Sequence, residues 1–544
     1  MKGLAEHLII VPVLLPLLSG AVMLLLNERS RIIKGGIGVA TTVALLIVSI
    51  MLLRLADLAP ATSGGPGVSV YQLGNWPAPF GIVLVLDRLS ALMLVLTSVL
   101  GLASLLFSLA RWHRAGPRFH TIFQLQLMGL NGAFLTGDLF NLFVFFEVLL
   151  AASYGLVLHG DGIVRVKAGL AYIAVNLTAS FLFLIGASLA YGVTGTLNMA
   201  DLAIRVPALA PGEISLVAAA AAILGTAFLM KAGAWPLNFW LPTTYAAASA
   251  PAAAMFAIMS KLGVYVILRL WTLVFGPEAG ALAGFGGTWL LVGGMLTIVF
   301  GTVGILASQS LPRLAGCSVL VSSGTLIAAI GTGNETVIGA ALFYLVSSTL
   351  GIAALFLLIE LVERLRDPGA DVLAVTMEAY GGGDDDEPQN DEVGIAIPAT
   401  IALLGGSFIA CALLLSGLPP LSGFIAKFAI MAAMFKVDGP AVQATTWTMV
   451  GLLTVSGLAT LIAMTRSGIS SFWARMDDSI PRVRVIEMIP VLALLLLCFG
   501  LTVAGGPTMQ YMEATTQALR IPQGYVKGVL TPERSGPEQG DDNQ

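Results

Sequence analysis

The chain has 544 residues, of which 57% are hydrophobic and only 11% are charged. Soluble domains average about 25% charged residues, so this composition leaves too little polar surface to coat a water-soluble globule. The net charge of −4 excludes a basic surface for nucleic acid, and three cysteines without a CxxC pair provide no disulfide framework and no zinc site.

Apolar segments long enough to cross a bilayer, which takes roughly 20 residues, recur along nearly the whole chain. They predict one all-α polytopic membrane domain with about fourteen spanning helices and short connections. The first segment is longer than the apolar part of a signal peptide and is not followed by an A-x-A-like cleavage site, so we interpret it as a helix. The segments lie near residues 7–27, 35–54, 82–110, 118–137, 139–158, 168–192, 214–238, 248–274, 286–308, 313–331, 335–361, 395–435, 445–466 and 486–506.

Three polar stretches separate or follow these segments. Residues 56–80 are rich in Gly and Pro and are predicted to form a loop. Residues 364–393 contain GGGDDDEPQND, which is too acidic for lipid or for a packed core, and are predicted to form a solvated loop. Residues 519–544 are predicted to be a polar tail.

The connections that follow odd-numbered segments carry most of the arginines and lysines between helices. Because positively charged connections stay on the cytoplasmic side, both termini of a chain with an even number of spans are predicted to face the outer side of the membrane.

Proline interrupts two of the predicted spans. One reads FLMKAGAWPLNFWLP, with Pro236 five residues after Lys231, and the other reads LLLSGLPPLSGFIAKF, with Pro419 and Pro420 ahead of Lys427. Proline removes a helical hydrogen bond, and broken backbone at membrane depth is tolerated only where protein buries it or where it lines a wet cavity. Two breaks at corresponding places in two halves indicate either internal repeats of the transporter type or two separate kinks.

Four charged side chains lie inside otherwise apolar segments, namely Glu147, Lys231, Lys261 and Lys427. A charge at the bilayer centre costs about 2.5–3.5 kcal/mol on insertion scales, so we expect each of them to face the interior of the bundle. Burial disfavours the charged form of such groups, which allows them to exchange protons. We interpret them as a candidate proton relay in which a Glu147–Lys231 ion pair forms and breaks; a purely structural role is the alternative.

Polar residues near the ends of spans have simpler interpretations. Asp138 in TGDLFNL is predicted to be a helix N-cap. Asp87 and Arg88 open the third span and are predicted to be interfacial, and His159 follows a helix end and is predicted to lie on the surface.

Four stretches resemble one family of membrane proteins. TGDLFNLFVFFEVLLAASY, KAGAWPLNFWLPTTY, MSKLGVYVILR and GLPPLSGFIAKF are similar to the antiporter-like proton-translocating family. That family includes the three large antiporter-like subunits of respiratory complex I and the large subunits of Mrp-type (Pha-type) cation/proton antiporters. The resemblance covers about residues 80–470, and the first stretch together with Lys427 looks most like the D-type branch of the Mrp group.

The resemblance implies two inverted five-helix repeats with broken helices 7 and 12. It divides the chain into N-terminal helices 1–3 (1–110), a first repeat of helices 4–8 (118–274), a second repeat of helices 9–13 (286–466) that contains the acidic loop, and a last helix with a polar tail (486–544). It also implies a role for each buried charge: the glutamate of helix 5 is Glu147, the lysine of broken helix 7 is Lys231, the bridging lysine of helix 8 is Lys261, and the terminal lysine of helix 12 is Lys427.

Two serines depart from the family pattern. Ser322 and Ser347 stand where many relatives carry histidine, so the stretch between Lys261 and Lys427 lacks titratable side chains. Because a hydroxyl both donates and accepts hydrogen bonds, we expect Ser322 and Ser347 to bridge this gap together with water.

The function that the resemblance implies is that of a proton-translocating subunit of a multisubunit Na⁺(K⁺)/H⁺ antiporter. Its partners are the other subunits, H⁺, and Na⁺ or K⁺, and its location is the inner (cell) membrane of a bacterium. The alternatives are a proton-pumping subunit of a complex I-like or hydrogenase-type redox complex, and a membrane scaffold that does not transport. The sequence contains no Walker A, GxGxxG or HExxH motif, so we expect a secondary transporter subunit without a cofactor or a metal, and not an enzyme.

Overall fold

A computed structural model describes residues 7–27, 29–58, 67–116, 118–160, 162–366, 399–436, 440–472 and 483–531. Each of the fourteen predicted spans contains a helix. The twelfth contains two, and a second short helix, α10, follows the end of the seventh. In chain order the helices are α2 (Val11–Leu25), α3 (Arg31–Leu58), α4 (Arg88–Ser108), α5 (Phe119–Leu135), α6 (Leu139–Val157), α7 (Ile163–Thr194), α9 (Ile214–Ala232) with α10 (Trp240–Ala247), α11 (Ala250–Leu273), α12 (Gly287–Ala307), α13 (Leu311–Gly331), α14 (Glu335–Arg366), α16 (Ala399–Ser416) with α17 (Ser422–Met434), α18 (Pro440–Phe472) and α19 (Val485–Val503).

Twelve helices in the described part of the chain are long and apolar enough to cross a membrane. The α2 and α5 helices, with 15 and 17 residues, are shorter than a typical span. The prediction of a polytopic helical membrane protein is therefore confirmed. Most of the predicted acidic loop 364–393 lies outside the described residues.

A small antiparallel sheet precedes α4, and it corrects two predictions. The β1 strand (Ser69–Gln72) lies within the predicted loop 56–80, and the β2 strand (Val83–Leu86) occupies the start of the predicted span 82–110. All four β2 residues are buried, and Val83 O accepts a hydrogen bond from Gly137 N at 3.0 Å. A short, fully buried apolar strand cannot be told from the first turn of an apolar helix by its sequence pattern, which explains the error.

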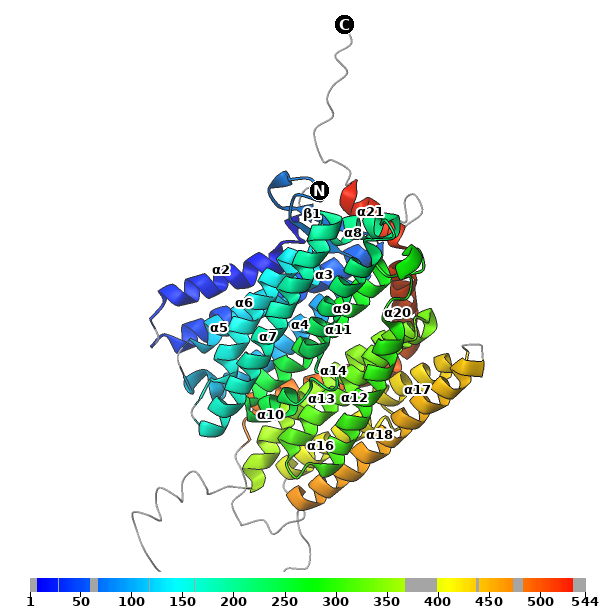
Figure 1. Ribbon diagram of the computed structural model, residues 1–544. Coiled ribbons are helices and arrows are strands. Elements are labelled where there is room, and N and C mark those ends of the chain that lie inside the picture. Colours follow the sequence, from blue (N-terminus) through cyan, green and yellow to red (C-terminus); the bar gives the residue numbers. More distant parts are fainter. Residues whose placement is uncertain are drawn as a thin grey trace, which may run out of the picture.

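Short elements gather with this sheet at one end of the bundle, which we call the hairpin end (Figure 1). The α21 helix packs against β1 and α8, while α20 packs along α14. Most of residues 519–530, the first part of the predicted polar tail, are helical, because they complete α20 and form α21. The short elements at this end are α8 (Met199–Arg205), α20 (Gly505–Arg520), α21 (Pro522–Leu530) and the 3₁₀ turns Leu73–Asn75, Val206–Ala208 and Gly280–Leu282, whereas the 3₁₀ turn Trp112–Arg114 lies at the other end.

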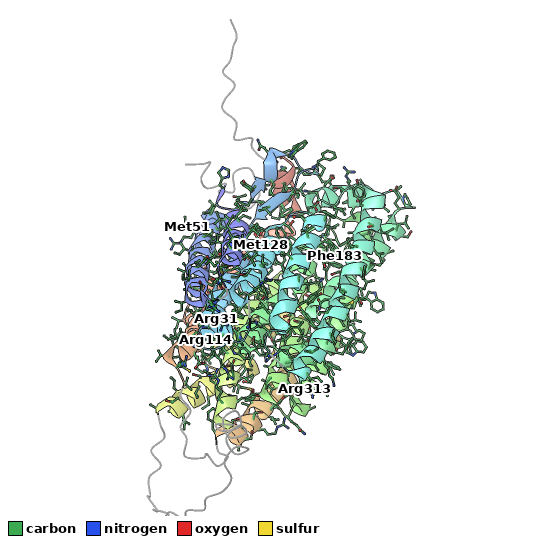
Figure 2. The ribbon with its side chains drawn as sticks, turned by 90° about the vertical axis from the view of Figure 1, so that its left-hand side faces the viewer. Arg31, Met51, Arg114, Met128, Phe183 and Arg313 are labelled. Atoms are coloured by element: carbon green, nitrogen blue, oxygen red, sulfur yellow. The ribbon has the colours of Figure 1, made fainter. Side chains whose placement is uncertain are left out.

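The opposite end of the bundle is rich in arginine, and we call it the arginine-rich end. Figure 2 shows Arg31, Arg114 and Arg313 well away from the hairpin end, and Arg31 Nη1 donates to Arg114 O at 3.3 Å. His159 lies at this end but is only 6% exposed, and its Nε2 atom is 2.9 Å from Trp112 O. The prediction that His159 lies on the surface is therefore wrong, because the turn that contains Trp112 covers it.

Three helices form the enclosed centre of the bundle. The α11, α13 and α14 helices are almost completely covered by other parts of the chain. The α14 helix packs against α11, α13, α16, α17, α19 and α20. Polar side chains on these three helices are shielded from lipid by protein, which is the placement that intramembrane polar groups require.

Candidate functional site

The first helix break lies between α9 and α10, where Pro236 is predicted to interrupt a span. Gly233 ends α9 with a φ of 72°, a conformation that side chains other than glycine rarely adopt. After the break, the Trp235 amide donates to Thr297 Oγ1 on α12 at 2.8 Å, so another helix satisfies a backbone group that the break leaves free. The break places Lys231 in the last turn of α9, where the negative end of the helix dipole favours a cation.

The second break lies between α16 and α17, at Pro419 and Pro420. Gly417 ends α16 with a φ of 77°. Lys427 reaches back from α17, and its Nζ atom donates to the carbonyl oxygens of Leu415 at 2.9 Å and Ser416 at 3.0 Å. The ammonium group therefore satisfies carbonyls that have no partner within α16. Lys231 thus lies in the last turn of the helix before the first break, and the Lys427 ammonium group binds the carboxyl end of the helix before the second break.

Glu147 and Lys231 lie near each other but do not form the predicted ion pair. Glu147 is partly exposed on α6, and its Oε1 atom accepts a hydrogen bond from Ser180 on α7 at 2.5 Å. Lys231 is 6% exposed, and its Nζ atom lies 4.6 Å from the centre of the Phe146 ring. It has no hydrogen-bond partner among the described residues and no carboxylate within 4.0 Å, although Glu147 acts on it electrostatically.

Lys261 lies at the centre of the molecule. Its side chain is completely buried on α11, and its Nζ atom donates to Ser323 Oγ on α13 at 3.2 Å. The α11 helix, which carries Lys261, lies very close to the α9 helix, which carries Lys231. Gly263 of α11 packs against the backbone of α9, where a Cβ atom at this position would lie only 2.7 Å from Phe228 O. Lys261 is therefore placed between the first half of the chain and the serines of α13.

Buried serines continue from Lys261 toward Lys427. Ser322 Oγ is 2.9 Å from Ser348 Oγ, and Ser347 Oγ is 2.8 Å from Ser422 Oγ. Ser322, Ser347 and Ser348 line one cavity of about 20 Å³, together with Leu415, whose carbonyl accepts from Lys427. A cavity of this size has room for about one water molecule.

The structure thus brings Ser322 and Ser347, predicted to bridge the gap, to one place between the two lysines. Ser323, Ser348 and Ser422 are not among the site residues predicted from the sequence. The signals that could have identified them are the paired serines in LVSSG and LVSST and the serine directly after the second break.

One buried charge pair is also absent from the predicted site. Asp87 is predicted to be interfacial, but its carboxylate accepts hydrogen bonds from both Nη atoms of Arg269 on α11. Arg269 lies within the predicted span 248–274 but is absent from the predicted set of intramembrane charges. The prediction for Asp138 is confirmed, since its Oδ1 atom caps α6 by accepting from the amides of Phe140 and Asn141.

The described residues contain no group of three or more His, Cys, Asp or Glu side chains placed to hold a metal ion. What the arrangement offers chemically is three buried lysines with serine hydroxyl groups between Lys261 and Lys427, and both kinds of group can accept and donate protons.

The helical fold with two broken helices, together with the buried lysines and serines between them, is characteristic of one class of membrane proteins. The family described as NADH:quinone oxidoreductase/Mrp antiporter, TM, matches residues 136–454. That range is more than half of the chain and contains Glu147, Lys231, Lys261, Lys427 and both helix breaks. The chain therefore belongs to this family of membrane subunits.

Particular relatives narrow the class further. The D-type subunit of a probable K(+)/H(+) antiporter of Rhizobium meliloti (strain 1021) is 62% identical over 535 residues, which are 98% of this chain and 99% of the relative. The D-type subunit of an Na(+)/H(+) antiporter of Alkalihalophilus pseudofirmus is 32% identical over 535 residues, with 96% of this chain and 99% of the relative covered.

Solved structures share the fold. A chain of the Mrp complex from Dietzia sp. DQ12-45-1b superposes with a TM-score of 0.82 at 26% identity, covering 97% of this chain and 99% of that chain. A chain of respiratory complex I from Thermus thermophilus gives a TM-score of 0.72 at 21% identity, with coverage of 94% and 99%. At that identity the second likeness concerns the fold alone.

Proposed function

We propose that this chain is the proton-translocating D-type subunit of a multisubunit antiporter that exchanges H⁺ for K⁺ or Na⁺ in a bacterial cell membrane. The observation that carries the proposal is the series of buried lysines and serines whose central members, Lys261 and the serines of α13 and α14, lie on the three most enclosed helices. The names of the relatives favour an antiporter over a redox complex, because the 62% identity is to an antiporter subunit. We further propose that the chain itself contains no redox or nucleotide site, so the energy comes from an ion gradient.

In the proposed relay, protons move between Glu147, Lys231, Lys261 and Lys427. Lys231 has no hydrogen-bond partner among the described residues, and the charge of Glu147 acts on it electrostatically. A change in the protonation of Glu147 therefore alters how tightly Lys231 holds its proton. Each serine hydroxyl beyond Lys261 accepts a proton on one side while it donates its own on the other, and water in the cavity joins the serine pairs.

We also propose that helices 4–8 (118–274) and 9–13 (286–466) are the two inverted repeats. The breaks support this, because alignment of Gly233 with Gly417 brings Pro236 opposite Pro420, and both glycines adopt the same left-handed conformation. The concentration of arginine at one end supports an orientation in which that end faces the cytoplasm and the hairpin end faces outward.

The test is cation-dependent proton exchange in everted membrane vesicles from antiporter-deficient cells that express the complete set of subunits. Lys231→Ala removes the ammonium group at the first break and is expected to abolish the cation-induced collapse of the pH gradient. Lys436→Ala is the matched control, because Lys436 is exposed just after α17 and lies outside the relay. Full exchange by Lys231→Ala in a normally assembled complex would contradict the proposal, and copurification with iron–sulfur subunits would favour the redox alternative.

A further inference from the structure

The buried ion pair between Asp87 and Arg269 lies at the hairpin end, outside the relay described above. Arg269 Nη1 donates to Asp87 Oδ2, and Nη2 donates to Oδ1 at 2.8 Å, so the contact is bidentate. The side chains are 6% and 13% exposed for Arg269 and Asp87. A buried ion pair is weak evidence for stability, since the cost of removing both charges from water offsets much of their attraction.

The α11 helix connects this pair with the centre of the relay. Lys261, Tyr265 and Arg269 follow one another at intervals of four residues, which places them on one face of the helix. The Tyr265 hydroxyl accepts a hydrogen bond from Arg269 Nη2 at 3.1 Å and donates one to Phe134 O at 2.6 Å. A polar stripe therefore runs along α11 from the enclosed centre to the hairpin end.

A cavity of about 20 Å³ lies beside the ion pair. Asp87, Arg269, Thr272 and Tyr525 are among the residues that line it, and α20 and α21 contribute one of its walls. The cavity has room for about one water molecule between the pair and the outer part of the hairpin end.

The surroundings give each partner of the pair a second interaction. Asp87 is also the N-cap of α4 and accepts from Ser90 N at 2.9 Å, so its carboxyl group stays in place when Arg269 moves. The Arg269 guanidinium lies 5.4 Å from the ring centres of both Tyr265 and Tyr525, whose faces attract a cation. Arg269 can therefore leave the carboxylate without being left in an apolar environment.

We propose that Tyr265, Arg269 and Asp87 form an outlet through which the proton on Lys261 reaches water at the hairpin end, and that the Asp87–Arg269 ion pair is the gate of this outlet. When Arg269 moves onto the tyrosine rings, the Lys261 ammonium gives its proton to the Tyr265 oxygen. Tyr265 passes its own hydroxyl proton to the Asp87 carboxylate, and Asp87 then releases it to the cavity water. Tyr265 and Asp87 return to their starting forms, and Lys261 is left neutral until the relay reprotonates it.

This inference rests on the proposed relay, so the experiment includes a variant of the relay itself. Vesicles that contain the complete complex are compared for initial exchange rate and for the apparent KM of the cation. Tyr265→Phe keeps the ion pair and removes only the hydroxyl, and Asp87→Asn keeps an N-cap but cannot accept a proton. We expect each to lower the rate by about 100-fold at an unchanged KM, as the loss of a group that transfers a proton does.

Asp57→Asn is the matched control, because Asp57 is 52% exposed and forms an ion pair with Arg88 at 2.9 Å at the same end of α4. Its rate is expected to stay within about twofold of the wild type, since exposed pairs contribute little. Asp87→Glu keeps a carboxyl group and should regain activity with a shifted pH profile, which a purely structural role of Asp87 does not predict.

The outcomes separate the two proposals. Wild-type rates for both Tyr265→Phe and Asp87→Asn, with Lys261→Met inactive, would overturn the outlet and leave the relay intact. Wild-type exchange by Lys261→Met would overturn the relay.

Discussion

The hydrogen bond between Ser347 and Ser422 provides a quantitative test of the second half of the relay. Ser347→Ala removes one hydroxyl and leaves the Ser422 hydroxyl, which is completely buried, without its partner at 2.8 Å. A buried polar group without a partner costs about 1–3 kcal/mol. When this cost enters the barrier for proton passage, the rate falls by about 5- to 150-fold, since roughly 1.4 kcal/mol corresponds to a factor of ten.

The assay is the initial rate of cation-induced proton exchange in vesicles, normalised to the amount of assembled complex. Ser407→Ala is the control, because Ser407 is also buried but donates only to Leu403 O of its own helix. If Ser347 and Ser422 act through one shared bond, the double variant is expected to be no slower than the slower single variant. Wild-type rates for Ser347→Ala and Ser422→Ala would refute a proton path through these serines.

Three further predictions concern the breaks and the arginine-rich end. Lys427→Met leaves two carbonyls at the end of α16 without their donor and should abolish exchange in the vesicle assay; retained exchange would exclude Lys427 from the relay. Gly233→Ala places a Cβ atom at a φ of 72° and should lower the stability of the complex by about 1–2 kcal/mol, measured as a lower melting temperature; an unchanged melting temperature would contradict the requirement for glycine. Burial and the positive charges of Arg114 and Arg31 lower the pKa of His113, so the folded state binds this proton less readily than the unfolded state. Stability should therefore fall as the pH drops below about 6.5, and His113→Gln should make that fall smaller in melting curves recorded from about pH 7.5 to 5.5.

The isolated charges and the helix breaks could be predicted from sequence because each is a local signal. Lys231, Lys261 and Lys427 are isolated charges in apolar segments of the sequence, and prolines occur at both breaks. The structure places all three lysines inside the bundle, as the cost of a charge in lipid requires. Their roles in proton transfer stay predictions.

Features that depend on contacts between distant segments could not be predicted. Asp87 and Arg269 are 182 residues apart, and neither segment alone indicates the pairing. The β2 strand has the composition of a spanning helix, and its pairing with β1 is determined by tertiary packing. The polar α20 and α21 helices lack a spanning pattern, and they are held by contacts with α14, α8 and β1.

The most direct test of the central claim, that protons cross this chain along its buried lysines, is proton flux through the purified complex in liposomes with Lys261→Met. Lys261 is completely buried, and its hydrogen bond to Ser323 joins the two halves of the line. We predict that the variant assembles and loses cation-driven proton flux. A flux equal to that of the wild type would contradict the claim.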